Sequence, residues 1–209
     1  MGEARVRGRP RGFDEGRALD AAVRLFRAEG YDGASVDRLC REMRVPRATL
    51  YDRFGGKEGL FLAAVARYAD TRIAPVLAAL GPAGALREDL TAFYEAVIAL
   101  ATADREEAPG CLVSCALADA AGAHPRFRGE LAARYDAMEE RITARLKAAE
   151  WDGRATTSPE SAAALAASIA RGLILAARSG AGTAELRPTA EAAVRALLTL
   201  HHEGTLGHG

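Results

Sequence analysis

The stretch Ser35–Gly59, SVDRLCREMRVPRATLYDRFGGKEG, predicts two short helices joined by a tight turn. Ser35 is a favourable N-cap residue, and the apolar residues after it recur at the spacing of one buried helical face: Val36, Leu39, Cys40 and Met43. Arg44 and Val45 then form the turn. Pro46 suits the first position of the second helix, because a proline lacks the N–H that would be unpaired there. This pattern is typical of a helix-turn-helix.

The second helix is expected to run to about Phe54 and to have two different faces. Leu50 and Phe54 lie four residues apart and define its inner side. Outward-pointing residues are polar or cationic: Arg47, Thr49, Tyr51 and Asp52. Such groups suit a nucleic-acid groove, whereas a helix of a protein-interaction module would show an exposed apolar patch. The Gly55-Gly56 pair ends this helix, and Lys57 begins a longer one.

At these residues the sequence resembles the DNA-binding domain of the TetR/AcrR family of bacterial transcriptional repressors. The match covers about the first sixty residues: AEGY at 28–31, the capped helix after Ser35, RATLY at 47–51, Phe54, and KEGL at 57–60. The family usually has glycine where this chain has Arg44, at a position that favours a left-handed backbone. We therefore expect backbone strain or a shifted turn there.

The resemblance implies a ligand-responsive repressor that binds a palindromic DNA operator as a homodimer, with half-sites about 34–36 Å apart. The last two long helices, residues 160–202, would form the dimer. Arg47 and Thr49 are candidates for base-edge or phosphate contact, Tyr51 and Lys57 for phosphate, and Ser35 for phosphate at a helix N-terminus. Arg9 and Arg11 lie in an arginine-rich arm that cannot build a core and that we expect to enter the minor groove.

Composition agrees with a basic DNA-binding part on a non-binding body. The chain has 209 residues and no formal net charge, but residues 1–57 hold 13 basic against 9 acidic residues. No N-terminal apolar run resembles a signal peptide, so we expect a cytoplasmic protein. The apolar stretch 162–177 is too short for a membrane span. Three cysteines, Cys40, Cys111 and Cys115, do not make an even disulfide set and are expected to stay reduced.

Helical periodicity continues through the rest of the chain, over roughly 57–73, 86–103, 110–122, 125–149, 160–180 and 188–202. Strand-like alternation and internal repeats are absent. We therefore predict an all-α fold of about nine helices. Residues 1–56 would form the arm and the helix-turn-helix domain, and residues 57–209 the effector-binding and dimerisation domain.

Family resemblance further implies a pocket for a small effector within the second domain. Its candidate lining residues are aromatic or sulfur-containing, and each also fits an ordinary core: Tyr68, Phe93, Tyr94, Cys111, Cys115, Phe127, Tyr135 and Met138. The sequence does not identify the effector, and it indicates no cofactor and no metal site.

The segment Gly110-Cys111-Leu112 resembles a subgroup of the family whose members respond to electrophiles or to copper. Cys111 and Cys115 are four residues apart on one helix face, and Cys111 lies near a helix N-terminus, so we expect it to be the easier thiolate. This suggests a thiol-responsive or metal-responsive regulator as an alternative, in which Cys111 reacts with or ligates the effector. Two buried, inert cysteines fit the same pattern.

An enzyme and a helical protein-interaction module are the alternatives from other classes of function. An enzyme needs convergent polar groups, but the sequence has no Gly-x-Ser-x-Gly, no His-Glu-x-x-His, no P-loop and no Gly-x-Gly-x-x-Gly. No catalytic residue is therefore expected. A helical protein-interaction module stays open as the second alternative.

Overall fold

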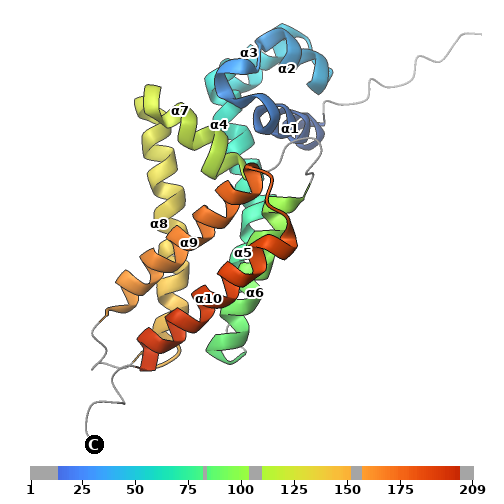
Figure 1. Ribbon diagram of the computed structural model, residues 1–209. Helices are drawn as coiled ribbons and strands as arrows, with labels where there is room; N and C mark the ends of the chain where they lie inside the picture. Colours follow the sequence, from blue (N-terminus) through green and yellow to red (C-terminus); the bar gives the residue numbers. More distant parts are fainter. Residues whose placement is uncertain (1–13, 82–83, 104–109, 152–156, 203–209) are drawn as a thin grey trace, which may run out of the picture.

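The computed structural model describes residues 14–81, 84–103, 110–151 and 157–202, and this part of the chain is all-α, as predicted (Figure 1). Arg9 and Arg11 lie outside the described residues. The elements are α1 (Glu15–Gly33), α2 (Val36–Met43), α3 (Arg47–Phe54), α4 (Lys57–Tyr68), η1 (Ala69–Ile73), α5 (Ala74–Ala78), α6 (Leu86–Thr102), η2 (Leu112–Leu117), α7 (Ala118–Ala123), α8 (Pro125–Lys147), α9 (Pro159–Arg178) and α10 (Thr183–His202). The π-helical segments η1 and η2 continue into their neighbours, so the described chain forms nine helices, of which α1 is broken by a kink with non-helical backbone at Gly30.

Helices α1 to α3 form a small head at one end of the molecule (Figure 1). Ser35 caps α2 as predicted, because its hydroxyl accepts a hydrogen bond from the N–H of Arg38 at 3.3 Å. Arg44 has φ 57° and ψ 43°, which confirms the expected left-handed backbone and costs about 1 kcal/mol for a residue with a Cβ. Pro46 is extended and stands at the N-cap of α3, one position earlier than predicted.

The helix that starts at Lys57 runs farther than predicted. We expected it to span about 57–73, yet α4, η1 and α5 continue past Pro75 to Ala78. A proline inside an α-helix removes one hydrogen bond and clashes with the carbonyl four residues earlier. Here the preceding turn is a π-turn, in which the N–H of Ala74 bonds to the carbonyl oxygen of Ala69, and this wider turn accommodates the ring.

Helices α6, α8, α9 and α10 pack together as the body (Figure 1). Arg145 and Asp89 form a buried ion pair at 2.6 Å that joins α8 to α6, and Arg145 also donates to the carbonyl oxygen of Gly84. The last helix begins at Thr183, five residues before the predicted start at Pro188. Glu185 favours this earlier start, because its carboxylate accepts a hydrogen bond from the backbone N–H of Gly182 at 2.5 Å.

By length and apolar composition, α9 could cross a membrane, but the core helix of a globular protein passes the same test. In the described chain α9 packs against α6, α8 and α10. Its fully buried residues form a continuous inner face of alanines, Ala162, Ala163, Ala166, Ala167 and Ala170. The packing therefore accounts for the apolar composition of this helix.

Candidate nucleic-acid interface and body cavity

The outer face of α3 carries the side chains that the sequence assigned to DNA contact. Arg47 and Tyr51 are exposed, Thr49 is half-buried, and Leu50 anchors the helix with no exposed surface. Tyr51 is 52% exposed. The buried Leu50 anchors one face of α3, and the polar residues on the opposite face are accessible to a partner.

Arg47 and Asp37 form a loose ion pair between α3 and α2, with Nε and Oδ1 3.5 Å apart. Both side chains are mostly exposed, so this pair contributes little stability. A guanidinium held this weakly can leave its carboxylate for a base edge or a phosphate. Ser35, at the exposed N-terminus of α2, is also placed for a phosphate contact, although its hydroxyl already caps the helix.

Lys57 has a second role besides the one predicted for it. Its Nζ lies 4.6 Å from the centre of the Tyr31 ring and donates to the carbonyl oxygen of Asp32 at 3.3 Å. Partial burial lowers the pKa of its ammonium group. Lys57 therefore connects the start of α4 to the last turn of α1. If its ammonium group also contacts DNA, it does so while it contacts Tyr31 and Asp32.

Between the head and the far end of the body lies a cavity of about 200 Å³, whose wall comes from η1, α5, α6, η2, α8 and α9. Most of the wall is apolar, with Ile73, Val97 and Leu100 among its residues, while Asp70, Ser114 and Arg134 add polar groups. Of the residues predicted for an effector pocket, Cys111, Tyr135 and Met138 line this cavity.

The other five predicted pocket residues lie elsewhere: Tyr68, Phe93, Tyr94, Cys115 and Phe127 are buried in the core. Phe127 packs edge-on against Tyr31 and Phe61, with ring centres 4.8 and 5.0 Å apart, at the junction of head and body. Tyr94 donates to the carbonyl oxygen of Ala166 at 3.1 Å. Sequence periodicity marks a side chain as inward-facing but does not distinguish a packed neighbour from a void.

Cys111 does not have the easily ionised thiol that the sequence suggested. It is buried, and burial raises the pKa of its thiol, although the N–H groups of Ser114 and Val113 and the hydroxyl of Tyr68 favour the thiolate. Desolvation outweighs the helix N-terminus, because a thiolate inside the protein loses its water. No group of three or more potential metal-ligating side chains (His, Cys, Asp or Glu) occurs among the described residues.

Arg27 connects the head to the segment that carries Cys111. Its Nη2 donates to the carbonyl oxygen of Gly110 at 3.1 Å, and its guanidinium lies 5.9 Å from the centre of the Tyr68 ring. Arg126 of α8 and Glu58 of α4 add an ion pair at 2.5 Å. The helix-turn-helix is therefore joined to the body by a buried hydrogen bond, an exposed ion pair and aromatic contacts.

The outward face of α9, one of the two helices expected to form the dimer, carries large apolar side chains, whereas two of its alanines face inward. Ala162 and Ala166 are fully buried within their own chain, because they pack against α6 and α8 and because Tyr94 bonds to the Ala166 carbonyl. Leu165 and Leu175 point outward instead and are 42% and 51% exposed. Both leucines are accessible to a partner.

Comparison with known proteins agrees with this architecture. The family model described as "Bacterial regulatory proteins, tetR family" matches residues 18–64. The HTH-type transcriptional repressor BdcR of Escherichia coli is 30% identical over 96% of this chain and 98% of its own length. The chain spans about half the length of two other curated relatives, YezE of Bacillus subtilis at 36% identity and ComR of Escherichia coli at 37%.

Among solved structures, a cysteine mutant of the TetR family transcriptional regulator CifR, complexed with 26-bp double-strand operator DNA, matches with a TM-score of 0.79. Its sequence is 32% identical, and the match covers 90% of this chain and 99% of that one. Reduced NemR of Escherichia coli, at 17% identity and a TM-score of 0.73, shares the fold.

Proposed function

The chain belongs to the tetR family of bacterial regulatory proteins and is a DNA-binding transcriptional regulator; we propose that it is a cytoplasmic repressor whose homodimer binds a palindromic operator and is released by a small effector. The exposed polar face of α3 on a rigid head is the observation that carries this proposal. The operator complex of CifR and the name of BdcR as a repressor support it.

DNA recognition is divided among the exposed residues of the head. Arg47 and Thr49 read base edges or adjoining phosphates, because they lie in the first turn of α3. Tyr51, Ser35 and Lys57 hold the phosphate backbone. Arg9 and Arg11, which precede the described residues, enter the minor groove in this proposal.

Dimerisation uses α9 and α10, within residues 160–202. Leu165 and Leu175 on the outer face of α9 would pack against the same residues of a second copy, since a twofold interface is self-complementary. Between them Gly172 is exposed and lacks a side chain, which allows two helices to approach closely.

The effector occupies the cavity behind η2. A volume of about 200 Å³ is below the usual range of drug-sized pockets, roughly 300–1,000 Å³, so a small compound is expected. Apolar side chains would cover most of it, while the hydroxyls of Ser114 and Tyr135 and the charged groups of Asp70 and Arg134 favour a polar end group. Displacement of η2 on binding would reach α1 through Gly110 and Arg27.

A thiol-responsive mechanism is the second candidate, because Cys111 lines the cavity while Cys40 and Cys115 do not. An electrophile that enters the cavity would meet the Cys111 sulfur without unfolding the protein. The raised pKa of this thiol makes the reaction slow at neutral pH, which favours the noncovalent effector.

The test begins with selection of duplexes from a random library by the full-length protein, followed by gel shift and footprinting. A palindromic site protected by a dimer is expected, and failure to retard any duplex would contradict the proposed function. A thermal-shift screen of small organic compounds, with electrophiles as a separate set, then addresses the effector. Compounds that stabilise wild type should have a weaker effect in Ala137→Leu, which adds bulk at the exposed rim of the cavity, but not in Ala133→Leu one turn away on α8.

A further inference from the structure

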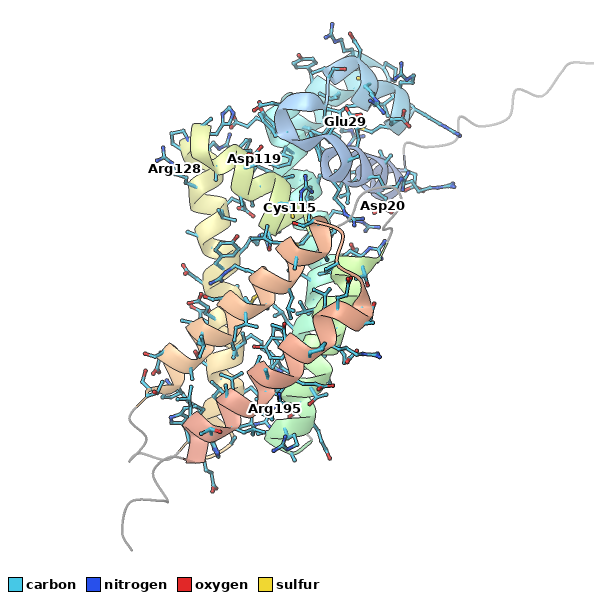
Figure 2. The ribbon with its side chains drawn as sticks, in the orientation of Figure 1. Asp20, Glu29, Cys115, Asp119, Arg128 and Arg195 are labelled. Carbon is cyan, nitrogen blue, oxygen red and sulfur yellow. The ribbon has the colours of Figure 1, made fainter. Side chains whose placement is uncertain are left out.

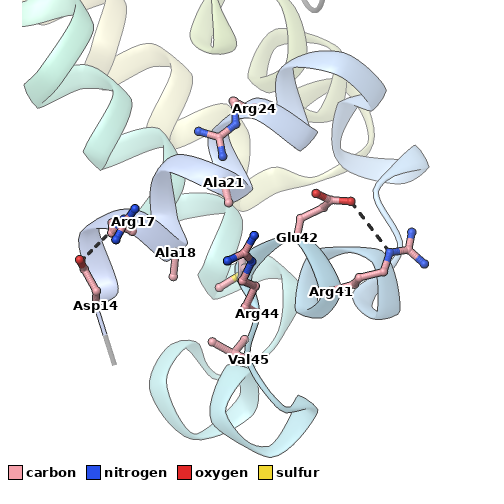
Figure 3. A pocket seen from close by; sticks show the side chains of 10 residues that line it. Asp14, Arg17, Ala18, Ala21, Arg24, Arg41, Glu42, Arg44 and Val45 are labelled. Atoms are coloured by element: carbon pink, nitrogen blue, oxygen red, sulfur yellow. Dashed lines mark hydrogen bonds and ion pairs between the residues drawn. The ribbon is translucent and has the colours of Figure 1, made fainter. Parts of the chain in front are cut away.

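A second hollow lies on the head, between α1 and the C-terminal end of α2, with a volume of about 740 Å³ (Figure 3). Arginines line both of its walls. Arg17 and Arg24 belong to α1, while Arg41 and Arg44 lie at the C-terminal end of α2. Small apolar residues, Ala18 and Ala21, lie between them. We call this hollow the arginine groove.

The arginine groove has more positive than negative charge, since its four arginines face two carboxylates, Asp14 and Glu42. Asp14 is occupied as the N-cap of α1, where its Oδ1 accepts from the N–H of Arg17 at 3.1 Å. Glu42 is 3.9 Å from Arg41, and both are exposed, so their attraction is weak. Within the described part of the chain, the guanidinium groups of Arg17, Arg24 and Arg44 have no carboxylate partner in an ion pair.

Arg44 is in an unfavourable position for any residue except glycine. It follows the last residue of α2 with a left-handed backbone, a place that glycine usually fills because a Cβ is strained there. Its side chain is exposed, so burial of the side chain does not compensate for the strain. An exposed arginine with a left-handed backbone motivates the hypothesis that its charge has a function.

The position of Arg44 relative to α3 suggests that use. Arg47 follows Arg44 by three positions, so their Cα atoms are at most about 11 Å apart. The major groove of DNA is about 12 Å wide and is bordered by phosphates on both sides. When α3 lies in the groove, the turn at Arg44 comes close to one of these backbones. Guanidinium groups bind phosphate oxygens through two parallel hydrogen bonds.

We propose that the arginine groove holds the phosphate backbone of operator DNA beside the half-site that α3 reads. This proposal rests on the proposed function, because it needs α3 to enter a major groove. It adds Arg17, Arg24, Arg41 and Arg44 to the DNA-contacting surface, and it gives a reason for an arginine with a left-handed backbone at the turn.

The decisive variant is Arg44→Gly, which removes the charge and relieves the strain at once. With the duplex selected by wild type, we expect this variant to bind about five- to tenfold more weakly. The slope of log affinity against log salt should become shallower by about 0.9, the value for one phosphate contact. Its melting temperature should rise by a few degrees. A purely structural role for Arg44 would move stability and DNA affinity in the same direction.

Three further variants complete the experiment. Arg24→Gln should also weaken binding and flatten the salt slope, while Glu42→Gln should tighten binding by removing a repelling charge. Arg87→Gln, an exposed residue at the start of α6 in the body, is the matched control and should bind like wild type. If wild type binds the duplex while Arg44→Gly and Arg24→Gln keep its affinity and slope, the proposal is overturned and the groove serves another anionic partner. If wild type binds no duplex, the proposed function itself fails.

Discussion

Arg27 of α1 donates a hydrogen bond from its Nη2 to the carbonyl oxygen of Gly110, 83 positions later in the chain, at 3.1 Å and out of contact with water. Gly110 has φ 93°, and a Cβ on it would lie 3.0 Å from the sulfur of Cys115, so the position requires glycine. The next residue, Cys111, lines the body cavity. This contact therefore joins α1 of the head to Gly110, the residue directly before Cys111 in the cavity wall.

Replacement of Arg27 by alanine should lower the free energy of unfolding by about 2 kcal/mol, because a charged hydrogen bond is lost and a buried carbonyl is left without its donor. For a chain of this size the melting temperature should fall by roughly 4–8 °C. Urea denaturation of Arg24→Ala, an exposed position one turn earlier on α1, provides the control and should change by less than about 0.5 kcal/mol. Equal losses in the two variants would show that the contact with Gly110 is not stabilising.

Arg47→Ala should weaken binding to the selected duplex by about 1–3 kcal/mol and should relax the preference for one base pair of each half-site. Lys57→Ala should weaken binding to all duplexes alike and make the salt slope shallower by about one unit. Because Lys57 also contacts Tyr31 and Asp32, this variant should melt at a lower temperature. Gel shifts with a set of single-base variants distinguish the two roles, and unchanged base preference in Arg47→Ala would contradict direct readout.

Leu175→Glu should convert the dimer into a folded monomer, because it places a charge on the exposed face of α9. Ala166→Glu should instead prevent folding, since this alanine is fully buried in its own chain. Figure 2 shows the side chains of the body helices, including those of α9 and α10. Sedimentation gives the oligomeric state of each variant, and far-ultraviolet circular dichroism gives its helix content. A Leu175→Glu protein that remains dimeric at micromolar concentration would place the interface elsewhere.

Alkaline pH should destabilise the protein from about pH 9 upward. Burial raises the pKa of Cys111, Tyr68 and Tyr94 in the folded state. The unfolded chain releases these protons near its ordinary pKa values, about 8.5 for Cys and 10 for Tyr. Above those values the unfolded state binds fewer protons than the folded state, so the free energy of unfolding decreases as pH rises.

Urea denaturation at pH 7, 9 and 10.5 measures this effect, with Tyr94→Phe as the comparison. The variant lacks one titrating group, so its stability should fall less steeply than that of wild type. Parallel curves for the two proteins would contradict the buried, protonated state of Tyr94.

Local signals in the sequence determined the helix-turn-helix and the all-α class. Ser35, Arg44 and Gly55 act on the backbone within a few residues of themselves, through a cap, a left-handed turn and a helix stop, so their effects follow from the sequence alone. The same holds for Leu50, whose spacing from Phe54 sets the outward face of α3. Arg47, Thr49 and Tyr51 could be assigned to that face for this reason.

Only the tertiary structure decided which inward-facing residues border a void and which pack against one another. Phe93 and Met138 have equivalent positions in their helical patterns, yet Phe93 packs against Tyr94 and Met138 lines the cavity. Cys111 looked reactive from its place at a helix start, but burial by other elements set its pKa. The arginine groove likewise joins Arg17 and Arg24 to Arg41 and Arg44 through the packing of α1 on α2. Such contacts depend on how whole helices meet in space, and a one-dimensional periodicity does not contain that information.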